Sequence, residues 1–515
     1  MGHRRLGAGL FAGTVAVGLA ATGVWAQRHD DDDDDKRMFE FAAPIMASPA
    51  ADMMGATPGG AQDIAYARDR IAAGEVPHPE TFTPEGLFSE HDLPLETGRA
   101  CKQVVCLTAA ATPAELIAQP EVRHLAQIGF ASNLDARTWK RPPMNLVAVI
   151  DKSGSMSGQP LDTVRASLHQ LVRQLGPEDQ IAVVLYGDRT HLHLPPTLVK
   201  DRAALDRAID AIESAGSTNM EDGLKLGFQI AERSAAAFEG VTRVMLFTDE
   251  RPNVGATDAG SFMGMARAHS AKGIGMTTIG VGAHFGAELA TAISSVRGGN
   301  LFFFPDHEAM VTKFTDDLDT MLIALAYDLD LEIAPAPGHR LVGLYGVPGD
   351  LVKRRPDGGL SMRVETIFLS KQKGAIFLAF APHGGGALPP APGPLGTVRV
   401  AYTGVDRAAH TDALAITSWT DGPLPLGLAR GRLLVDEVTT LRAAAEAHLS
   451  GNDQEKAWQL VRALRQKFAQ TDVPGLDGER AVIDHLHTTL SRLSGHQGEG
   501  ASVAVGRDPI DGLPR

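Results

Sequence analysis

Residues 144–155 read MNLVAVIDKSGS, and their pattern is the strongest indication of the fold in this chain. The apolar run Leu146–Ile150 ends at Asp151, and Ser153 and Ser155 follow on either side of Gly154. An apolar run of this length, bounded by turn residues, is typical of a strand buried in a parallel sheet. Ligands in open α/β sheets bind at the carboxyl ends of such strands. One carboxylate and two hydroxyls at that edge are oxygen ligands of the kind that Mg²⁺ prefers, so we expect a metal site.

Strand-like and helical patterns alternate from residue 146 to residue 304 and predict a doubly wound parallel sheet with right-handed crossovers. The predicted strands are Leu146–Ile150, Ile181–Tyr186, Val244–Phe247, Met276–Val281 and Leu301–Phe304, with Leu192–Leu198 as an edge strand because Pro195 and Pro196 cannot donate to a ladder. The predicted helices are Leu161–Leu175, Arg202–Ile212, Glu221–Glu232, Ala259–Lys272, Ala287–Val296 and Glu308–Leu322.

The DxSxS pattern of residues 151–155 resembles the metal-ion-dependent adhesion site (MIDAS) of von Willebrand factor type A (VWA) domains. The same resemblance matches Thr218, in AGSTNMEDG, and Asp249, in RVMLFTDERPN, to the remaining ligands of that site. It implies that Mg²⁺, or Mn²⁺ or Ca²⁺, is held by Asp151, Ser153, Ser155, Thr218 and Asp249. The family usually has Gly after the second aspartate, whereas this chain has Glu250, which could bind a second ion, alter the loop or point to solvent.

Each of these residues also has a purely structural explanation. Ser153 and Ser155 suit a turn or cap before a helix. Thr218 suits a helix cap with Glu221 as its capping-box partner, and Asp249 suits a turn. The coincidence of all these polar groups at the carboxyl ends of strands favours the metal site. Because only two of the five ligands are anionic, the resemblance implies a cation whose coordination is completed by a Glu or Asp of a partner protein.

The N-terminus predicts export. Residues 1–26 combine the basic His3–Arg5, an apolar stretch and a small-residue cleavage pattern at Val24–Ala26, which together are typical of a signal peptide. An uncleaved signal anchor is the alternative, since the apolar stretch approaches the roughly 20 residues that span a bilayer. Residues 27–62, with the acidic block Asp30–Asp35, are interpreted as a disordered linker.

The flanks of the central region predict a β-sandwich into which the VWA domain (residues 144–323) is inserted. Residues 63–143 would supply a helical segment and the first strands, and residues 324–420 the remaining strands. The predicted strands are Lys102–Leu107, Arg123–Phe130, Leu329–Ile333, Leu341–Val347, Ser361–Leu369, Gly374–Ala381 and Gly396–Thr403. Residues 421–494 predict helices at Leu428–Leu449, Asp453–Gln470 and Gly478–Leu493, and residues 495–515 a disordered tail. The arrangement resembles a bacterial cell-envelope VWA subfamily, distantly similar to inter-alpha-trypsin inhibitor heavy chains.

The composition disfavours nucleic acid as a partner, and the sequence does not decide whether the two cysteines form a disulfide. The chain has 515 residues and a formal net charge of −14, so it offers no electrostatic footprint for nucleic acid. Cys101 and Cys106 would lie on opposite faces of one extended strand, and a disulfide between them would need a turn or bulge.

The motifs that could suggest an enzyme are better explained by structural roles. Gly280–Gly286 has GxGxxxG spacing on a late strand, which suits a strand-to-helix turn better than a dinucleotide site. Ser370 and Lys373 match S-x-x-K but sit at an expected hairpin tip. His191 and His193 lie on one face of the edge strand and are expected to be solvated. We therefore expect an exported, metal-dependent protein-binding module of the periplasm or cell envelope, with a structural or assembly factor of the envelope as the alternative.

Overall fold

The structure is a computed structural model of the chain. It describes residues 53–58, 64–135, 137–217, 219–249, 261–281, 292, 296–304, 307–347, 351–370, 373–383 and 393–496. The chain divides into two units, Met1–Ala47 and Ser48–Arg515, and every described residue belongs to the second. The expected signal peptide, the C-terminal tail and most of the expected helix Ala287–Val296 lie outside the described residues.

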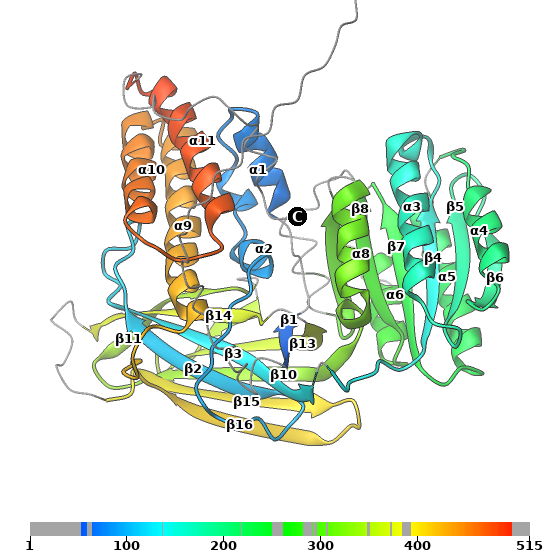
Figure 1. Cartoon of the computed structure of the whole chain (residues 1–515), viewed down its shortest axis with the longest axis horizontal. Coiled ribbons are helices and arrows are strands. Elements are labelled where there is room, and N and C mark those ends of the chain that lie inside the picture. The colour runs from blue at the N-terminus through cyan, green and yellow to red at the C-terminus, as the bar shows by residue number, and fades with distance from the viewer. Residues whose placement is uncertain are drawn as a thin grey trace, which may run out of the picture. The chain divides into compact units, whose positions relative to one another are not determined.

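The central region is a six-stranded sheet in the order β6-β5-β4-β7-β8-β9 (Figure 1). All neighbouring strands are parallel except β6, which pairs antiparallel with β5 at the edge. The strands are β4 (Met144–Asp151), β5 (Gln180–Tyr186), β6 (His191–Leu198), β7 (Val241–Thr248), β8 (Gly275–Val281) and β9 (Gly299–Phe304). The helices are α3 (Gln159–Gln174), α4 (Arg202–Asp210), α5 (Met220–Ala235), α6 (Phe262–Ser270) and α8 (His307–Met321).

Both faces of this sheet are covered by helices, which explains the uninterrupted apolar run of β4. Leu146, Ala148 and Ile150 belong to the core cluster that includes α3 and α8. Val147 and Val149 belong to the cluster that includes α5 and α6. Every residue of β4 is buried because alternate side chains serve opposite faces. The doubly wound α/β prediction is confirmed.

A second, antiparallel sheet is built from strands on both sides of the central region. Its order is β11-β14-β3-β1-β13-β10-β15-β16, with β12 paired to β13 and β2 paired to β3. Its strands are β1 (Met53–Pro58), β2 (Cys106–Pro113), β3 (His124–Asp135), β10 (Ala324–Pro335), β11 (His339–Tyr345), β12 (Val352–Arg354), β13 (Leu360–Ser370), β14 (Ala375–Pro382), β15 (Gly396–Gly404) and β16 (Ala409–Ile416).

The strands before and after the central region therefore join, as the sequence predicts. They form one continuously hydrogen-bonded sheet, and side chains of β2 and β3 share an apolar core with those of β10, β13 and β15. The free edge of β2 approaches the end of β16 through a bridge between Ala111 and Ser418. The sheet thus curls around its core as the layers of a sandwich do.

Three local predictions in this region need correction. The expected linker 27–62 contains β1, whose backbone pairs with β13 and β3; its MMGATP sequence lacks the alternation that would have marked a strand. The expected strand Lys102–Leu107 is wrong over most of its length, because β2 begins only at Cys106. A bend at residues 103–105 brings Cys101 and Cys106 together in a disulfide with a Cα–Cα distance of 5.6 Å. The strands β12 and β16 were not predicted.

A helical layer lies on the outer face of β3 and β14 (Figure 1). It comprises α1 (Ala65–Ala72), α2 (Pro84–Ser89), α9 (Leu426–Leu449), α10 (Gln454–Ala469) and α11 (Asp477–Leu493). Asp453 caps α10 by accepting a hydrogen bond from the backbone of Lys456. Among the described residues no helix combines the length and the apolar character needed to cross a membrane.

Candidate metal centre

Asp151 ends β4 at the carboxyl edge of the central sheet and is fully buried. Its Oδ1 accepts a hydrogen bond from the Ser153 backbone N–H at 2.8 Å. Its Oδ2 accepts from the Tyr186 hydroxyl at 3.2 Å and from the Thr248 hydroxyl at 3.1 Å. A carboxylate has about four lone-pair positions, so these three donors leave about one for a further ligand. Asp151 is therefore held rigidly, with limited capacity for direct coordination.

Ser153, Ser155 and Asp249 form a chain of oxygen atoms beside this carboxylate. The two serine hydroxyl oxygens are 3.1 Å apart, and the Ser155 hydroxyl donates to Asp249 Oδ1 at 3.1 Å. Neighbouring ligands of an octahedral ion with bonds of about 2.1 Å are separated by about 3.0 Å. Both observed separations match that edge length. Asp249 follows β7, so two neighbouring parallel strands supply the carboxylates.

The loop before α5 is hydrogen-bonded to the DxSxS segment. The Ala215 N–H donates to the Lys152 carbonyl at 2.7 Å, and the Gly154 N–H donates to the Gly216 carbonyl at 3.1 Å. Gly216 has a φ of +90°, a conformation that favours glycine. Thr218 itself lies outside the described residues. Asn219 caps α5 by accepting from the Asp222 backbone, so the capping role considered for Thr218 belongs to its neighbour.

The electrostatics of the site favour a cation. Partial burial raises the pKa of the Asp249 carboxyl, the hydrogen bond from Ser155 acts in the opposite direction, and the nearby Asp151 carboxylate raises the pKa further. Two carboxylates that face one another at a partly buried edge repel unless a positive charge lies between them. A bound cation would relieve this electrostatic repulsion between Asp151 and Asp249.

The donor set fits a hard divalent ion. Among the described residues no group of three or more His, Cys, Asp or Glu side chains could hold a metal. A cation at this edge would therefore depend on the hydroxyls of Ser153 and Ser155 beside the two carboxylates. Oxygen-only ligation of this kind suits Mg²⁺, Mn²⁺ or Ca²⁺ better than soft metals.

Tyr186 and Thr248 are the site residues that sequence reasoning missed. Both are fully buried at the ends of β5 and β7, beside the ends of β4. The only signal was their position as the last residue of a buried strand. A Cβ at Gly223 of α5 would lie 2.6 Å from the Tyr186 ring, so the helix packs closely against this tyrosine and fixes its hydroxyl.

We expect Tyr186→Phe to weaken both the fold and the metal centre. The substitution removes one hydrogen bond to a buried carboxylate, which is worth about 1.5–3 kcal/mol. The unfolding free energy should fall by about that amount, and cation affinity should fall several-fold because Asp151 is less firmly oriented. Urea denaturation and calorimetric Mg²⁺ titration measure the two effects. Tyr66→Phe, on the exposed side of α1, is the control, and unchanged values for Tyr186→Phe would contradict the assignment.

The structure places the described residues of the other motifs weighed in the sequence as follows. Most of Gly280–Gly286 lies outside the described residues. Ser370 ends β13, and the backbone N–H of Lys373 donates to Asp92 Oδ1 at 2.8 Å, which is a loop contact. His191 is exposed as expected, but His193 is half-buried and its Nε2 lies 2.7 Å from the Ala208 carbonyl oxygen.

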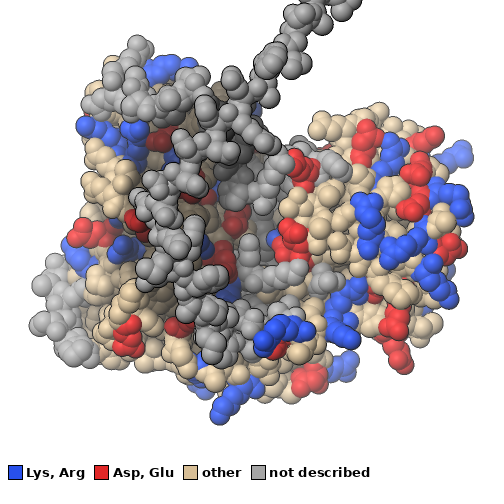
Figure 2. Space-filling model, viewed as in Figure 1, with Lys and Arg blue, Asp and Glu red and all other residues tan. Residues whose placement is uncertain are grey.

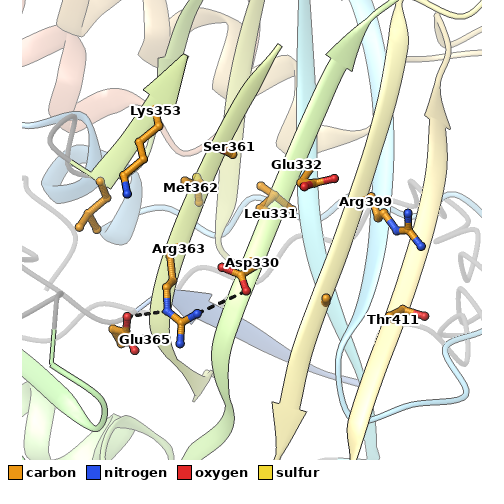
Figure 3. A pocket seen from close by; sticks show the side chains of 12 residues that line it. Asp330, Leu331, Glu332, Lys353, Ser361, Met362, Arg363, Glu365, Arg399 and Thr411 are labelled. Atoms are coloured by element: carbon orange, nitrogen blue, oxygen red, sulfur yellow. Dashed lines mark hydrogen bonds and ion pairs between the residues drawn. The ribbon is translucent and has the colours of Figure 1, made fainter. Parts of the chain in front are cut away.

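The antiparallel sheet carries a hollow of about 780 Å³ on strands β10, β12, β13, β15 and β16 (Figure 3). Its acidic side chains are already engaged: Arg363 pairs with Glu365 at 2.8 Å and with Asp330 at 3.4 Å. Glu332 pairs with Arg355 at 3.0 Å. These pairs neutralise the acidic side chains that line the hollow.

Residues 145–317 match the family model of the von Willebrand factor type A domain. This part of the chain is a VWA domain, which confirms the resemblance drawn from the DxSxS pattern. Domains of this class are commonly metal-dependent protein-interaction modules.

The chain is also similar to other proteins over parts of its length. Uncharacterized protein YfbK of Escherichia coli is 32% identical over 215 residues, which are 41% of this chain and 37% of that protein. Human inter-alpha-trypsin inhibitor heavy chain H4 is 30% identical over 132 residues, 24% of this chain and 14% of that protein. The chain thus spans well under half the length of either relative. The solved von Willebrand factor type A structure from Catenulispora acidiphila is 13% identical, covers 71% of this chain and 88% of its own, and has a TM-score of 0.43.

Proposed function

We propose that this chain is a metal-ion-dependent protein-binding module whose VWA domain recognises a Glu or Asp side chain of a partner protein. The observation that carries the proposal is the chain of oxygens from Ser153 through Ser155 to Asp249, with octahedral spacing. Asp151, Ser153, Ser155, Thr218 and Asp249 are the proposed ligands of Mg²⁺, with Mn²⁺ or Ca²⁺ as alternatives.

The chemistry of recognition follows from the charge of these ligands. Asp151 and Asp249 bring two negative charges, and their arrangement with neutral hydroxyls would leave a bound divalent ion with affinity for a further anionic oxygen. The donors to Asp151 hold that carboxylate in place, and Ser153 is buried, so Ser155 and Asp249 form the open edge of the site. Ser155 and Asp249 are only partly covered or exposed, so a carboxylate from outside can reach this edge. The proposed role is binding and not catalysis.

The surface chemistry supports a protein partner and not a nucleic acid. In the view of Figure 2, basic and acidic side chains are interspersed over the VWA domain, and this face does not carry charge of one sign. A nucleic-acid site would require a basic stripe along one face. The net charge of −14 points the same way.

We further propose that the chain is exported and acts in the periplasm or cell envelope. The sequence pattern of residues 1–26 supports export, and the Cys101–Cys106 disulfide is consistent with an oxidising compartment. A membrane would be involved only through an uncleaved signal anchor. The second candidate function is a structural or assembly factor of the envelope, in which the helices of residues 421–494 would provide a further contact surface.

Crosslinking in the native envelope tests the proposed function. Wild-type protein should capture a defined partner in Mg²⁺, and a chelator should remove the capture. Asp249→Ala should lose capture in Mg²⁺, whereas Asp162→Ala, an exposed carboxylate of α3, should retain it. Capture that persists undiminished in the chelator would overturn metal-dependent recognition. A partner that belongs to a stable multi-subunit complex would favour the assembly factor over an adhesion-type module.

A further inference from the structure

The helical layer contains a buried cluster of charged side chains that the metal centre does not use. Its members are Arg68 of α1, Glu90 and His91 just after α2, Glu437 of α9 and Glu479 of α11. Arg68 pairs with Glu90 at 2.6 Å and with Glu479 at 2.7 Å. The Nε2 of His91 lies 2.9 Å from the same Glu479 oxygen. We call these five residues the acidic cluster.

The acidic cluster joins two parts of the chain that are far apart in sequence. Residues 64–91, which contain α1 and α2, pack against α9 and α11 through an apolar core that includes Ile64, Ala67 and Ile71. A peripheral hydrogen bond runs from Arg442 of α9 to the Phe82 carbonyl at 2.6 Å. Glu437 and Glu479 are buried at this junction, whereas Glu90 reaches solvent at its edge, so the charges that must be balanced within the protein are those of the two buried glutamates.

The charges of the acidic cluster do not balance when all its carboxylates are ionised. Two buried carboxylates, Glu437 and Glu479, share one guanidinium, that of Arg68, which also pairs with the exposed Glu90. Glu437 is 1% exposed, and its Oε2 has no hydrogen-bond partner in the described part of the chain. Its side chain shares a hydrogen bond with Glu479, which requires a proton on one of the two carboxyl groups, and a second buried negative charge here would cost several kcal/mol.

The pKa values of the two buried glutamates shift in opposite directions. Burial raises the pKa of Glu437 well above its ordinary value, and the nearby Glu479 carboxylate adds to the shift. Burial also disfavours the charged form of Glu479, but the hydrogen bond to His91 and the positive charge of Arg68 outweigh it and lower the pKa. Of the two, Glu479 therefore loses its proton first and Glu437 holds a proton more firmly.

We propose that the acidic cluster is an acid-stabilised latch: a proton held by Glu437 keeps residues 64–91 docked on α9 and α11, and its loss at higher pH loosens them. A group whose pKa is raised in the folded state contributes stability that is complete below its unfolded pKa, about 4.3 for Glu, and is lost as the pH rises through the folded pKa. The latch is therefore tightest in acid. Glu85 of α2, whose pKa is raised by burial although the positive charge of Arg442 acts against it, titrates in the same direction at the edge of the junction.

Hydrogen exchange measured by mass spectrometry tests the latch on the whole chain. Amide protection in α1 and α2 is followed from pH 5 to pH 8 after correction for intrinsic exchange, with α3 of the VWA domain as the internal reference. One proton lost on opening changes the opening equilibrium up to tenfold per pH unit. We expect the protection of α1 in the wild type to fall with pH at up to that rate while α3 changes less.

Two variants separate the latch from a general effect of charge. Glu437→Gln imitates the protonated side chain, so α1 should be protected at pH 8 at least tenfold better than in the wild type, with a shallower pH dependence. Glu446→Gln removes an exposed carboxylate from the same helix and should behave as the wild type. Protection of α1 that is independent of pH in the wild type, or an unchanged slope in Glu437→Gln, would overturn the proposal. Wild-type protection that does not fall with pH overturns the proposal even if a variant folds poorly, the slope in Glu437→Gln assigns the pH dependence to Glu437, and none of these outcomes depends on the metal centre.

Discussion

Replacing Asp151 with alanine is expected to abolish measurable Mg²⁺ binding while the VWA domain stays folded. Asp151 contributes one of the two negative charges at the site, and two opposite charges about 4 Å apart interact by several kcal/mol even at an effective dielectric constant of 20. Loss of about 3 kcal/mol corresponds to at least 100-fold weaker binding. Calorimetric titration of Mg²⁺, Mn²⁺ and Ca²⁺ measures the affinity, and circular dichroism reports the fold.

The substitution should also lower the unfolding free energy of the VWA domain, and two opposing contributions set the size of that loss. The substitution leaves the Tyr186 and Thr248 hydroxyls without their shared acceptor, but it also removes a buried carboxylate that faces Asp249. Asp162→Ala, with an exposed carboxylate on α3, is the matched control and should bind as the wild type. Mg²⁺ affinity within a few-fold of the wild type in Asp151→Ala would show that the site residues are assigned wrongly.

The elements that position the metal centre could be predicted because their sequence signals are local. Leu146–Ile150 has no polar interruption since both faces of β4 are covered, and Asp151 marks the strand end within one residue. The same holds for Val244–Phe247 before Asp249. Parallel topology then places the two carboxylates at one edge without any knowledge of their contacts.

What escaped prediction depends on contacts between distant segments. Tyr186 looks like any buried aromatic residue until β5 lies beside β4 and brings its hydroxyl to Asp151. The β1 strand has little intrinsic strand character and is defined by its pairing with β13, more than 300 residues away. The acidic cluster likewise unites α1 with α11, and no periodicity in the sequence links Arg68 to Glu479.

Strand geometry alone could not decide whether Cys101 and Cys106 form a disulfide. An extended strand forbids a bond between residues five positions apart on opposite faces, and a turn permits it. The bend at residues 103–105 provides that turn and delays the start of β2 to Cys106. A continuous strand Lys102–Leu107 and the Cys101–Cys106 disulfide cannot both form, and the structure contains the disulfide.

Replacing Gly431 with alanine is expected to destabilise the helical layer, although alanine normally favours a helix by about 1 kcal/mol over glycine. Gly431 lies in α9 against Phe377 of β14, and a Cβ at this position would lie 1.9 Å from the ring Cζ and 2.1 Å from Cε1. Phe377 is fully buried and packs edge-on against Phe88 at a centroid distance of 5.1 Å, so its ring has little room to move. Overpacking of this kind costs about 1–3 kcal/mol or more and should outweigh the propensity gain.

The sign of the change in Gly431→Ala therefore separates packing from propensity. Urea denaturation should show a lower midpoint for the helical layer, whereas Gly393→Ala, where a Cβ would meet nothing within 4 Å, should leave the midpoint unchanged or raise it slightly. Phe377→Leu should compensate part of the loss in Gly431→Ala, because the smaller side chain makes room for the new methyl group. The double variant should therefore be destabilised by less than the sum of the two single variants. A Gly431→Ala variant as stable as the wild type would mean that α9 can withdraw from β14 at little cost, and the close packing of the helical layer on the sheet would then be wrong.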